Sequence, residues 1–335
     1  MIGRSTPEFV LTRTPLRVSF AGGGTDLAAF YESQYGAVVS TAINKYIYVT
    51  VKRHGAIFNE PIRLNYSKSE QVNRIDEIEN NIARECLRFL GIDPPIYVST
   101  VGDLPASTGL GGSSAFAVGL LNALHAYKGE RVAAGQLAEE ACHIEIKILQ
   151  EPIGKQDQYS AAYGGFNVLR FRRGGNVTVE PVRLSNGGLS SLFRQMLLFW
   201  TGHQRDASVV LSEQKQNTAD KMELLLAMRG QALELQKLFY DGTCSLEAFG
   251  RILEVGWQFK RELARAISNE QIDRWYNLGR TAGALGGKLC GAGGGGFLLF
   301  IAPTESHGRI RKALAELRDV TVDSEVHGSQ ILMSE

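Results

Sequence analysis

Apolar and polar positions alternate over short stretches in the first half of the chain, as they do in half-buried strands. The stretches that predict strands are 16–20, 38–52, 95–101 and 163–184. Two segments between them have a different pattern. An almost continuous apolar run at 115–124 predicts a buried helix, and helical periodicity at 134–149 predicts a second helix. Ser113 or Ser114 is the expected N-cap of the buried helix.

Helical periodicity dominates the second half of the chain. The elements predicted there are helices at 206–240, 245–268, 270–285 and 308–318, and strands at 196–200, 297–302 and near 320–327. A strand-rich half followed by a helix-rich half with interspersed strands predicts an α+β fold of two domains. We place a strand-rich N-terminal domain at 1–190 and a helix-rich α/β C-terminal domain at 191–335.

The chain carries 36 Lys and Arg against 35 Asp and Glu, a formal net charge of +1. This balance argues against bulk electrostatic binding to nucleic acid or to an anionic membrane. No stretch approaches the roughly 18 apolar residues of a membrane-spanning helix, and residues 1–15 lack the apolar core of a secretion signal. The four cysteines have no metal-binding spacing. We therefore expect a soluble cytoplasmic protein with reduced thiols, with a homodimer as the candidate assembly, and with no nucleic-acid or membrane partner.

Glycine accounts for 37 of the 335 residues and is concentrated at 22–24, 109–112 and 291–296. Concentrated glycine marks loops whose backbone adopts unusual angles or approaches a ligand closely. The third cluster matches GxGxxG, but it follows a helix-like segment and precedes a strand, the reverse of the order in dinucleotide-binding folds. A P-loop is not expected either, because Lys288 is followed by Leu289 and not by Ser or Thr. The sequence therefore argues against a nicotinamide cofactor.

The second glycine cluster lies in the segment 104–115, LPASTGLGGSSA, which leads into the predicted buried helix. The first N–H groups of a helix have no intrahelical partner and carry partial positive charge, so they bind anions readily. Glycines let this backbone approach phosphate oxygens, and the serine hydroxyls can donate hydrogen bonds or bind a metal ion. The segment therefore predicts a phosphate site; the alternative is a glycine-rich helix cap without a ligand.

Two carboxylates are candidates for the chemistry. Glu145 lies beside the apolar stripe of its predicted helix, away from the other charges, and needs a cation, a metal ion or a proton as partner. A buried ion pair with an arginine is the alternative. Asp157 lies among polar residues in a loop, where an aspartate is usually a solvated turn residue. We favour a catalytic role for it because the chain also has a phosphate segment, an inward glutamate and Arg17 on the non-core side of its strand.

Three segments resemble the GHMP small-molecule kinases, the family of the galacto-, homoserine, mevalonate and phosphomevalonate kinases. They occur in the family's order and spacing across nearly the whole chain, at 15–27, 105–115 and 291–297. The resemblance implies a two-domain GHMP kinase fold, with the active site in the cleft between the domains, and phosphoryl transfer from ATP with Mg²⁺. Within this family, the chain is most similar to the D-glycero-D-manno-heptose 7-phosphate kinases, and the L-fucose kinases come next. The segments that carry this similarity are AGGGTDL at 21–27, EPIGKQDQY at 151–159 and CGAGGGGF at 290–297.

The resemblance also implies a role for each matched residue. The ATP phosphates would be held by Pro105, Ser107, Thr108, Gly109, Leu110, Gly111, Gly112, Ser113 and Ser114. Ser114 and Glu145 would bind Mg²⁺. Asp157 would accept or orient the proton of the attacking hydroxyl, and Arg17 would keep Asp157 ionised and neutralise phosphoryl charge. The third glycine loop would close over the substrate side of the cleft, and the sugar would contact Gly23, Gly24, Thr25, Asp26, Gly293 and Gly294.

The acceptor that the resemblance implies is the anomeric hydroxyl of the heptose 7-phosphate, giving a 1,7-bisphosphate for GDP-heptose and surface polysaccharide synthesis. Gly23 and Gly24 stand where galactokinases have Glu and His, so galactose is not expected. An acceptor that carries a phosphate needs a second anion site. The candidates for that site are Arg205, as first choice, and Lys155, Arg172 and Arg173. The alternatives are L-fucose or another hexose as acceptor, and a non-catalytic protein that binds a sugar or a nucleotide.

Overall fold

The computed structural model describes residues 7–335 apart from 185–186, 205–209, 214–216 and 219, and in this part of the chain it contains two β-sheets. The larger sheet has the strand order β12-β1-β2-β5-β3-β4, and β6 pairs with both β2 and β7. Its strands are β1 Phe9–Ala21, β2 Gly36–Arg53, β3 Ile62–Asn65, β4 Ser69–Val72, β5 Ile96–Gly102, β6 Phe166–Phe171, β7 Val177–Pro181 and β12 Gln330–Ser334. β2 pairs with β5 through residues 47–53 and with β6 through residues 36–41, so one long strand links two branches of the sheet.

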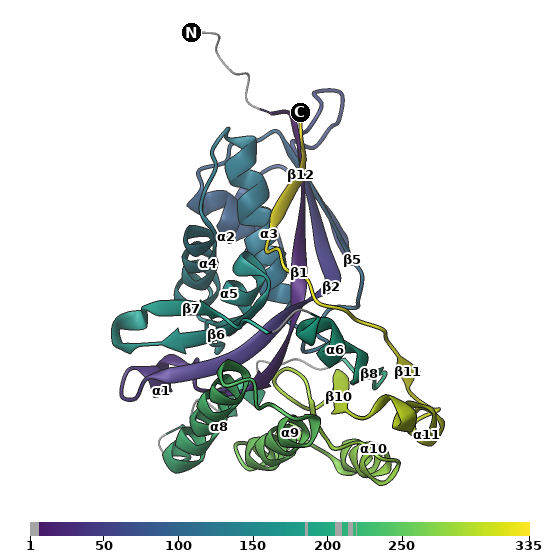
Figure 1. Ribbon diagram of the computed structural model, residues 1–335. Helices are drawn as coiled ribbons and strands as arrows, with labels where there is room; N and C mark the ends of the chain where they lie inside the picture. Colours follow the sequence, from purple (N-terminus) through teal and green to yellow (C-terminus); the bar gives the residue numbers. More distant parts are fainter. Residues whose placement is uncertain (1–6, 185–186, 205–209, 214–216, 219) are drawn as a thin grey trace.

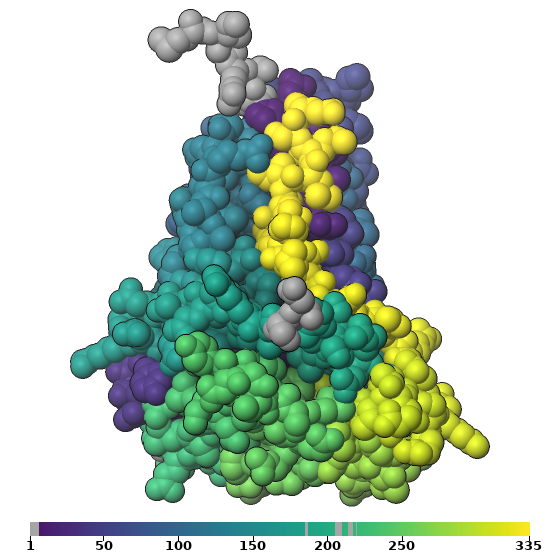
Figure 2. All heavy atoms as spheres, in the orientation of Figure 1, coloured from purple at the N-terminus to yellow at the C-terminus, as the bar shows by residue number. Residues whose placement is uncertain are grey.

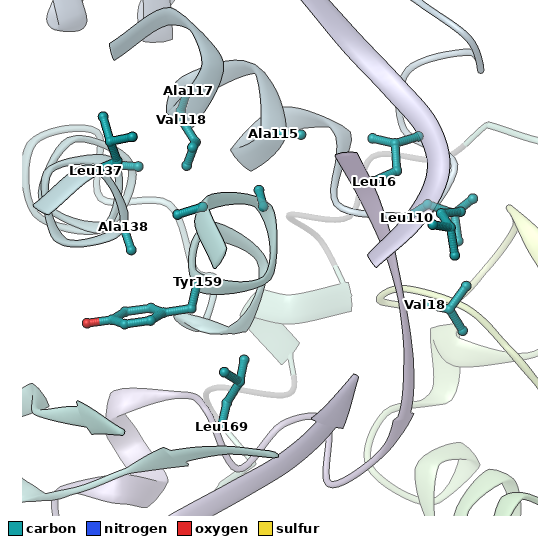
Figure 3. Packing of buried hydrophobic residues seen from close by; sticks show 14 of the residues in the cluster. Leu16, Val18, Leu110, Ala115, Ala117, Val118, Leu137, Ala138, Tyr159 and Leu169 are labelled. Carbon is teal, nitrogen blue, oxygen red and sulfur yellow. The ribbon is translucent and has the colours of Figure 1, made fainter. Parts of the chain in front are cut away.

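Helices cover one face of the larger sheet (Figure 1). They are α2 Asn81–Phe89, α3 Gly112–Tyr127, α4 Ala134–Cys142 and α5 Gln156–Tyr163. α3 packs directly on β1 and β2, and most of its residues are buried, as its apolar run predicts. Val118 of α3, Leu137 of α4 and Tyr159 of α5 belong to one core that also includes strand residues (Figure 3). This packing fixes the N-terminus of α3 relative to β1.

The smaller sheet is antiparallel, with the order β11-β8-β10-β9. Its strands are β8 Met196–Trp200, β9 Gly286–Leu289, β10 Phe297–Ile301 and β11 Arg318–Asp319, and the longer helices of this part are α8 Met222–Tyr240, α9 Leu246–Arg261, α10 Glu270–Thr281 and α11 His307–Ala313. α9 and α10 pack against β9, whereas α8 packs against α9 and against β1 and β2 of the larger sheet. α8 and α9 therefore join the two sheets.

Short elements complete the described part of the chain. They are α1 Ala28–Tyr31, α6 Gly188–Arg194, 3-10 turns at Ile75–Glu77, Arg173–Gly175, Arg265–Ile267 and Thr304–Ser306, and a π-helix at His143–Ile148 that continues α4. None of the helices within the described ranges is long and apolar enough to cross a bilayer.

The α+β architecture is confirmed, and the predicted final strand is wrong. Residues 320–327 form only an isolated bridge between Ser324 and Ile43, whereas the last strand is β12, which pairs with β1. β12 is a partly exposed strand at the edge of the sheet, where the apolar pattern is weak. Figure 2 shows this segment, in yellow, along the surface of the first part of the chain. The division into domains between residues 190 and 191 stays a prediction. If the chain divides there, its last strand, β12, returns from the second domain to the sheet of the first.

Candidate active site

The N-terminus of α3 forms the first part of the site. Gly111, with φ +79°, is the N-cap, and its carbonyl accepts the first intrahelical hydrogen bond, from the N–H of Ala115 at 2.9 Å. The N–H groups of Gly112, Ser113 and Ser114 therefore have no intrahelical acceptor, which is the arrangement that binds anions. The predicted serine cap is wrong, because a glycine in the left-handed conformation takes that position and leaves both serine hydroxyls for another partner.

The rest of the predicted ATP loop is anchored to the core by Leu110. Its side chain is fully buried beside β1 (Figure 3), and its carbonyl accepts a hydrogen bond from the N–H of Arg17 at 3.0 Å. Thr108 is buried, and Pro105 and Ser107 are exposed. Ser107 has φ +57°, a conformation that is rare outside glycine and that clusters at functional sites.

The glycine loop between β9 and β10 packs against this phosphate loop. A Cβ on Gly291 would lie 2.2 Å from the Cα of Gly109, so only glycine permits the contact. β9 precedes the loop, which corrects the expected helix-like segment before it. A strand also follows the loop, so a dinucleotide-binding turn remains excluded. Gly293 and Gly294, predicted to contact the sugar, pack against the backbone of Ile267 and are not among the residues that line the cleft described below.

Arg17 of β1 and Asp157 of α5, predicted as the catalytic residues, lie in direct contact beside the phosphate loop. Nε of Arg17 donates to Oδ1 of Asp157 at 2.8 Å, and Nη2 donates to Oδ2 at 2.7 Å. Nη1 donates to the carbonyl of Gly109 at 2.8 Å. A bidentate pair of this kind fixes the orientation of the carboxylate and compensates its charge. Arg17 thus joins the phosphate loop to the carboxylate that faces the cleft.

Asp26 lies on the same wall of the cleft. Its Oδ1 accepts a hydrogen bond from the N–H of Gly24 at 2.9 Å, and its Oδ2 accepts one from the N–H of Gln156 at 3.3 Å. Burial and, less strongly, the charge of Asp157 raise the pKa of Asp26 above its ordinary value. Gly154 packs so closely that a Cβ there would lie 2.0 Å from Oδ2. The two segments that carry these aspartates are thereby held together.

Glu145 is a buried carboxylate that forms no ion pair within the described ranges. It lies in the π-helix, a rare turn that is frequent at functional sites. Oε1 accepts from the Ser113 hydroxyl at 2.9 Å, and Oε2 accepts from Nε2 of Gln158 at 2.7 Å. Burial raises the pKa of Glu145 to about 7. The carboxylate and hydroxyl oxygens beside an anion site fit a hard divalent cation better than the alternative of a pair with an arginine.

These groups surround a cleft that opens to solvent and holds about 840 Å³ of free space, its open mouth included. Its walls come from β1 and the loop after it, the segment before α5, the helices α8 and α9, and the glycine loop. Gly23, Gly24 and Asp26 line the cleft. Thr25 is fully buried, and its hydroxyl donates to the backbone of Gly22, so its role is to hold the loop.

Two buried lysines that sequence reasoning missed also line the cleft. They are Lys260, near the end of α9, and Lys288, in β9. Burial, with a smaller contribution from neighbouring positive charges, lowers the pKa of Lys260 to about 7, and burial lowers that of Lys288 to about 8. One signal was available in the sequence: Lys288 is the only charged residue between Arg280 and Glu305. Lys260 lies in an ordinary charged helix terminus and gave no such signal.

Three of the four residues predicted to bind a phosphate on the acceptor, Lys155, Arg172 and Arg173, lie away from the cleft. Nζ of Lys155 donates to both carboxylate oxygens of Glu139 at 3.0 Å and to a backbone carbonyl. Arg172 and Arg173 are exposed in the turn between β6 and β7. None of these three described cations lines the cleft. Arg205, the first choice, lies outside the described residues.

Models of one protein family match both halves of the chain. The GHMP kinases N terminal domain matches residues 73–165, and the GHMP kinases C terminal domain matches residues 242–320. The first range contains the phosphate loop, Glu145 and Asp157, and the second contains the glycine loop with both buried lysines.

Individual relatives are similar over nearly the full length of the chain. A D-glycero-alpha-D-manno-heptose 7-phosphate kinase from Campylobacter jejuni is 30% identical over 317 residues, covering 90% of this chain and 92% of that protein. A bifunctional fucokinase/GDP-fucose pyrophosphorylase from Arabidopsis thaliana is 25% identical over 340 residues, covering 92% of this chain and 31% of that protein. A crystal structure of a D-glycero-D-manno-heptose 1-phosphate kinase from Bacteroides thetaiotaomicron has the same fold, with a TM-score of 0.78 and 24% identity, covering 97% of this chain and 99% of that one.

Proposed function

The chain belongs to the GHMP kinases, which are ATP-dependent phosphotransferases, and we propose that it phosphorylates the anomeric hydroxyl of D-glycero-D-manno-heptose 7-phosphate. The products would be ADP and the 1,7-bisphosphate. The similarity to the Campylobacter kinase over nearly all of both chains supports a heptose phosphate as the acceptor. The observation that carries the proposal is the position of the Arg17–Asp157 pair, between the phosphate loop and a cleft lined by Asp26.

Asp157 is the group that meets the reacting hydroxyl. The anomeric oxygen forms a bond to the γ-phosphorus of ATP, the bond from that phosphorus to the β–γ bridging oxygen breaks, and ADP leaves with the electron pair. The hydroxyl proton passes to the Asp157 carboxylate. Because both of its oxygens accept hydrogen bonds from Arg17, Asp157 mainly orients the hydroxyl and takes the proton late. Arg17 compensates charge on the transferred group, and most of the acceleration comes from positioning.

Asp26 and its neighbours are suited to hold the sugar. Each Asp26 oxygen accepts one backbone hydrogen bond and keeps a further lone pair for a sugar hydroxyl. Gly23 and Gly24 bring no side chain to this wall of the cleft. The space that they leave favours an acceptor larger than a hexose.

The phosphate loop also fits Mg²⁺ as the metal ion. Ser114 and Glu145 would hold the ion, because Glu145 is buried with neutral hydrogen-bond donors and has its own charge uncompensated. Bound there, Mg²⁺ would neutralise charge on the ATP phosphates.

Steady-state formation of ADP with a panel of acceptors tests the proposed acceptor. The panel is D-glycero-D-manno-heptose 7-phosphate, the corresponding 1-phosphate, the free heptose and L-fucose. We expect the highest kcat/KM with the 7-phosphate. A higher value with the 1-phosphate or with L-fucose would assign another acceptor. No ADP with any of the four would favour a non-catalytic binding protein.

A further inference from the structure

Lys260 and Lys288 are cations of the cleft that the proposed phosphoryl transfer does not use. We propose that their ammonium groups, together with the hydroxyl of Ser19, bind the phosphate that the acceptor already carries. The identity of the acceptor rests on the proposed function. The existence of an anion site rests on the contacts, the burial and the charges of these three residues.

Backbone carbonyls alone hold the two ammonium groups at the cleft. Nζ of Lys288 donates to the carbonyl of Ser19 at 2.8 Å and, more weakly, to the next carbonyl along β1. Nζ of Lys260 donates to the carbonyl of Gly291 and, at 3.5 Å, to that of Leu289. An ammonium group has three N–H donors. Each lysine therefore retains a donor for a ligand.

Neither lysine forms an ion pair with a carboxylate within the described part of the chain, and Asp157 contributes only a minor attraction to Lys260. The two carboxylates of the cleft are engaged elsewhere: Asp157 pairs with Arg17, and Asp26 accepts hydrogen bonds from backbone N–H groups. A buried ammonium group without a counter-ion is unfavourable, which is why burial lowers the pKa of both lysines. An anion bound in the cleft would supply the missing charge.

Ser19 provides independent evidence for a ligand beside the two lysines. Its Oγ is buried and has no hydrogen-bond partner. Buried hydroxyl groups in folded proteins are normally hydrogen-bonded. Ser19 lines the cleft, and its own carbonyl accepts from Lys288, so the hydroxyl and the ammonium group lie at the same point of the wall. A phosphate oxygen there could accept from both.

Lys155 is a buried lysine with a structural role, and it can be compared with Lys260. Lys155 and Lys260 each have 9% of their surface exposed, so the two are equally buried. Lys155, however, forms an ion pair with Glu139 at 3.0 Å and does not line the cleft. Burial alone therefore does not distinguish Lys260; the lack of a counter-ion at the cleft does.

Ser19 and Lys288 are displaced along β1 from the phosphate loop, whereas Lys260 lies toward that loop, because it donates to the carbonyl of Gly291, which packs against Gly109. Arg17 contacts Gly109 of that loop, and Ser19 lies two residues further on the same face of the strand, about 7 Å away. An acceptor that places its reacting hydroxyl at Asp157 would extend along β1 with its other end at Ser19. The phosphate of the acceptor would then lie at Ser19 and Lys288, with Lys260 on its side toward the transferred phosphoryl group.

The kinetics of lysine variants with two acceptors test this site. Lys260→Met and Lys288→Met keep an unbranched side chain, one atom shorter, and remove the charge, and Lys155→Met is the matched control. The measured quantity is the ratio of kcat/KM for the heptose 7-phosphate to kcat/KM for the free heptose. We expect this ratio to fall about tenfold or more in each cleft variant, mainly through the KM of the phosphorylated acceptor, and to be unchanged in the control.

Two results would overturn the inference. An equal loss with both acceptors would mean that the lysines serve the fold. A raised KM for ATP with an unchanged ratio would mean that they serve the transferred phosphoryl group. Ser19→Ala removes only one hydroxyl and tests the site if a lysine variant does not fold. It should lower the ratio about threefold, and an unchanged ratio would remove Ser19 from the site.

Binding of inorganic phosphate separates this inference from the proposed function. With the nucleotide site filled by MgADP, the wild-type protein should broaden the phosphorus NMR signal of inorganic phosphate, and Lys260→Met should not. If the wild type binds phosphate in this way but does not phosphorylate the heptose 7-phosphate, the proposed acceptor is wrong and the anion site stands. Equal broadening by both proteins, or none by either, overturns the anion site.

Discussion

Three carboxylates at the site differ in what compensates their charge. Asp157 pairs with the guanidinium of Arg17, Asp26 accepts from backbone N–H groups, and Glu145 has only hydroxyl and amide donors. Burial raises the pKa of Asp26 and of Glu145 above their ordinary values. The carboxylate with a full counter-charge is suited to orient a reacting hydroxyl, and the buried one without a cation is suited to a metal ion.

Asp157→Asn keeps the size of the side chain and removes the proton acceptor. We expect kcat to fall about 10²–10⁴-fold, with little change in the KM for ATP, because the phosphate loop is left intact. Initial rates at saturating acceptor with varied ATP measure both quantities. Turnover close to that of the wild type would show that Asp157 does not take the proton.

Stabilisation by Mg²⁺ should depend on pH through Glu145. Its pKa is raised from 4.5 to about 7, so in the metal-free protein its contribution to stability is present below pH 4.5 and is lost as the pH rises through about 7. Mg²⁺ must displace the proton that Glu145 binds below that pH. The rise in Tm on adding MgCl₂ with ADP should therefore be larger at pH 8 than at pH 6.

Glu145→Gln is the matched control for this pH effect. The amide has nearly the same size and does not titrate, so the difference between the two pH values should disappear, and a higher Mg²⁺ concentration should be needed for half-maximal activity. The same pH dependence in the wild type and in Glu145→Gln would remove Glu145 from the metal site.

At the scale of the elements, the phosphate loop and the glycine loop are in direct backbone contact at the site. Gly109 of the phosphate loop and Gly291 of the hairpin between β9 and β10 approach too closely for a side chain on either residue. The hairpin therefore packs tightly against the loop that would hold ATP. The position of one loop sets the position of the other.

Gly291→Ala should disturb the phosphate loop. Its Cβ would lie 2.2 Å from the Cα of Gly109, and its φ of +73° is unfavourable for alanine, so one of the two loops must move. We expect a loss of about 1–3 kcal/mol in the free energy of unfolding and a higher KM for ATP. Urea denaturation and initial rates measure these changes.

Gly230→Ala is the comparison for this variant. Gly230 lies within α8 with open space around it, so alanine should be neutral or slightly stabilising there. If Gly291→Ala behaved like Gly230→Ala in both measurements, the close contact between the loops would not matter for function.

Local patterns made α3 predictable but not the ends of several elements. The apolar run at 115–124 predicted a buried helix, and α3 is that helix, because a continuous apolar segment of this length has few other stable environments. The cap was wrong because the left-handed conformation of Gly111 depends on the loop that it closes. The π-helix at Glu145 also could not be predicted, since its periodicity differs little from that of an α-helix over one turn.

For the molecule as a whole, the cleft depends on contacts between residues far apart in the sequence. Lys288 and Ser19 are 269 residues apart and meet because β9 packs near the end of β1. No periodicity in the sequence encodes such a meeting, and so Lys260 and Lys288 were missed. Arg17 and Asp157 were predicted because the resemblance of whole segments to a known family supplied the long-range pairing that local patterns lack.

The return of the chain to the larger sheet should contribute to stability. Deleting residues 329–335 removes β12 from β1 and removes the Ser329 hydroxyl, which bonds to Thr14 at 2.8 Å and to Asn122 at 2.9 Å. We expect the free energy of unfolding to fall by about 2 kcal/mol or more. Urea denaturation measures it, and an unchanged midpoint and slope would show that the last strand is dispensable.

Phosphorus NMR of the protein with MgATP and D-glycero-D-manno-heptose 7-phosphate tests the central claim most directly. We expect a new anomeric phosphate signal that grows at the same rate as the signals of ADP. The bisphosphate formed should also show a 7-phosphate signal of the same intensity as its anomeric signal. ADP that appears with inorganic phosphate alone, or ATP that remains unchanged, would contradict transfer to the anomeric hydroxyl.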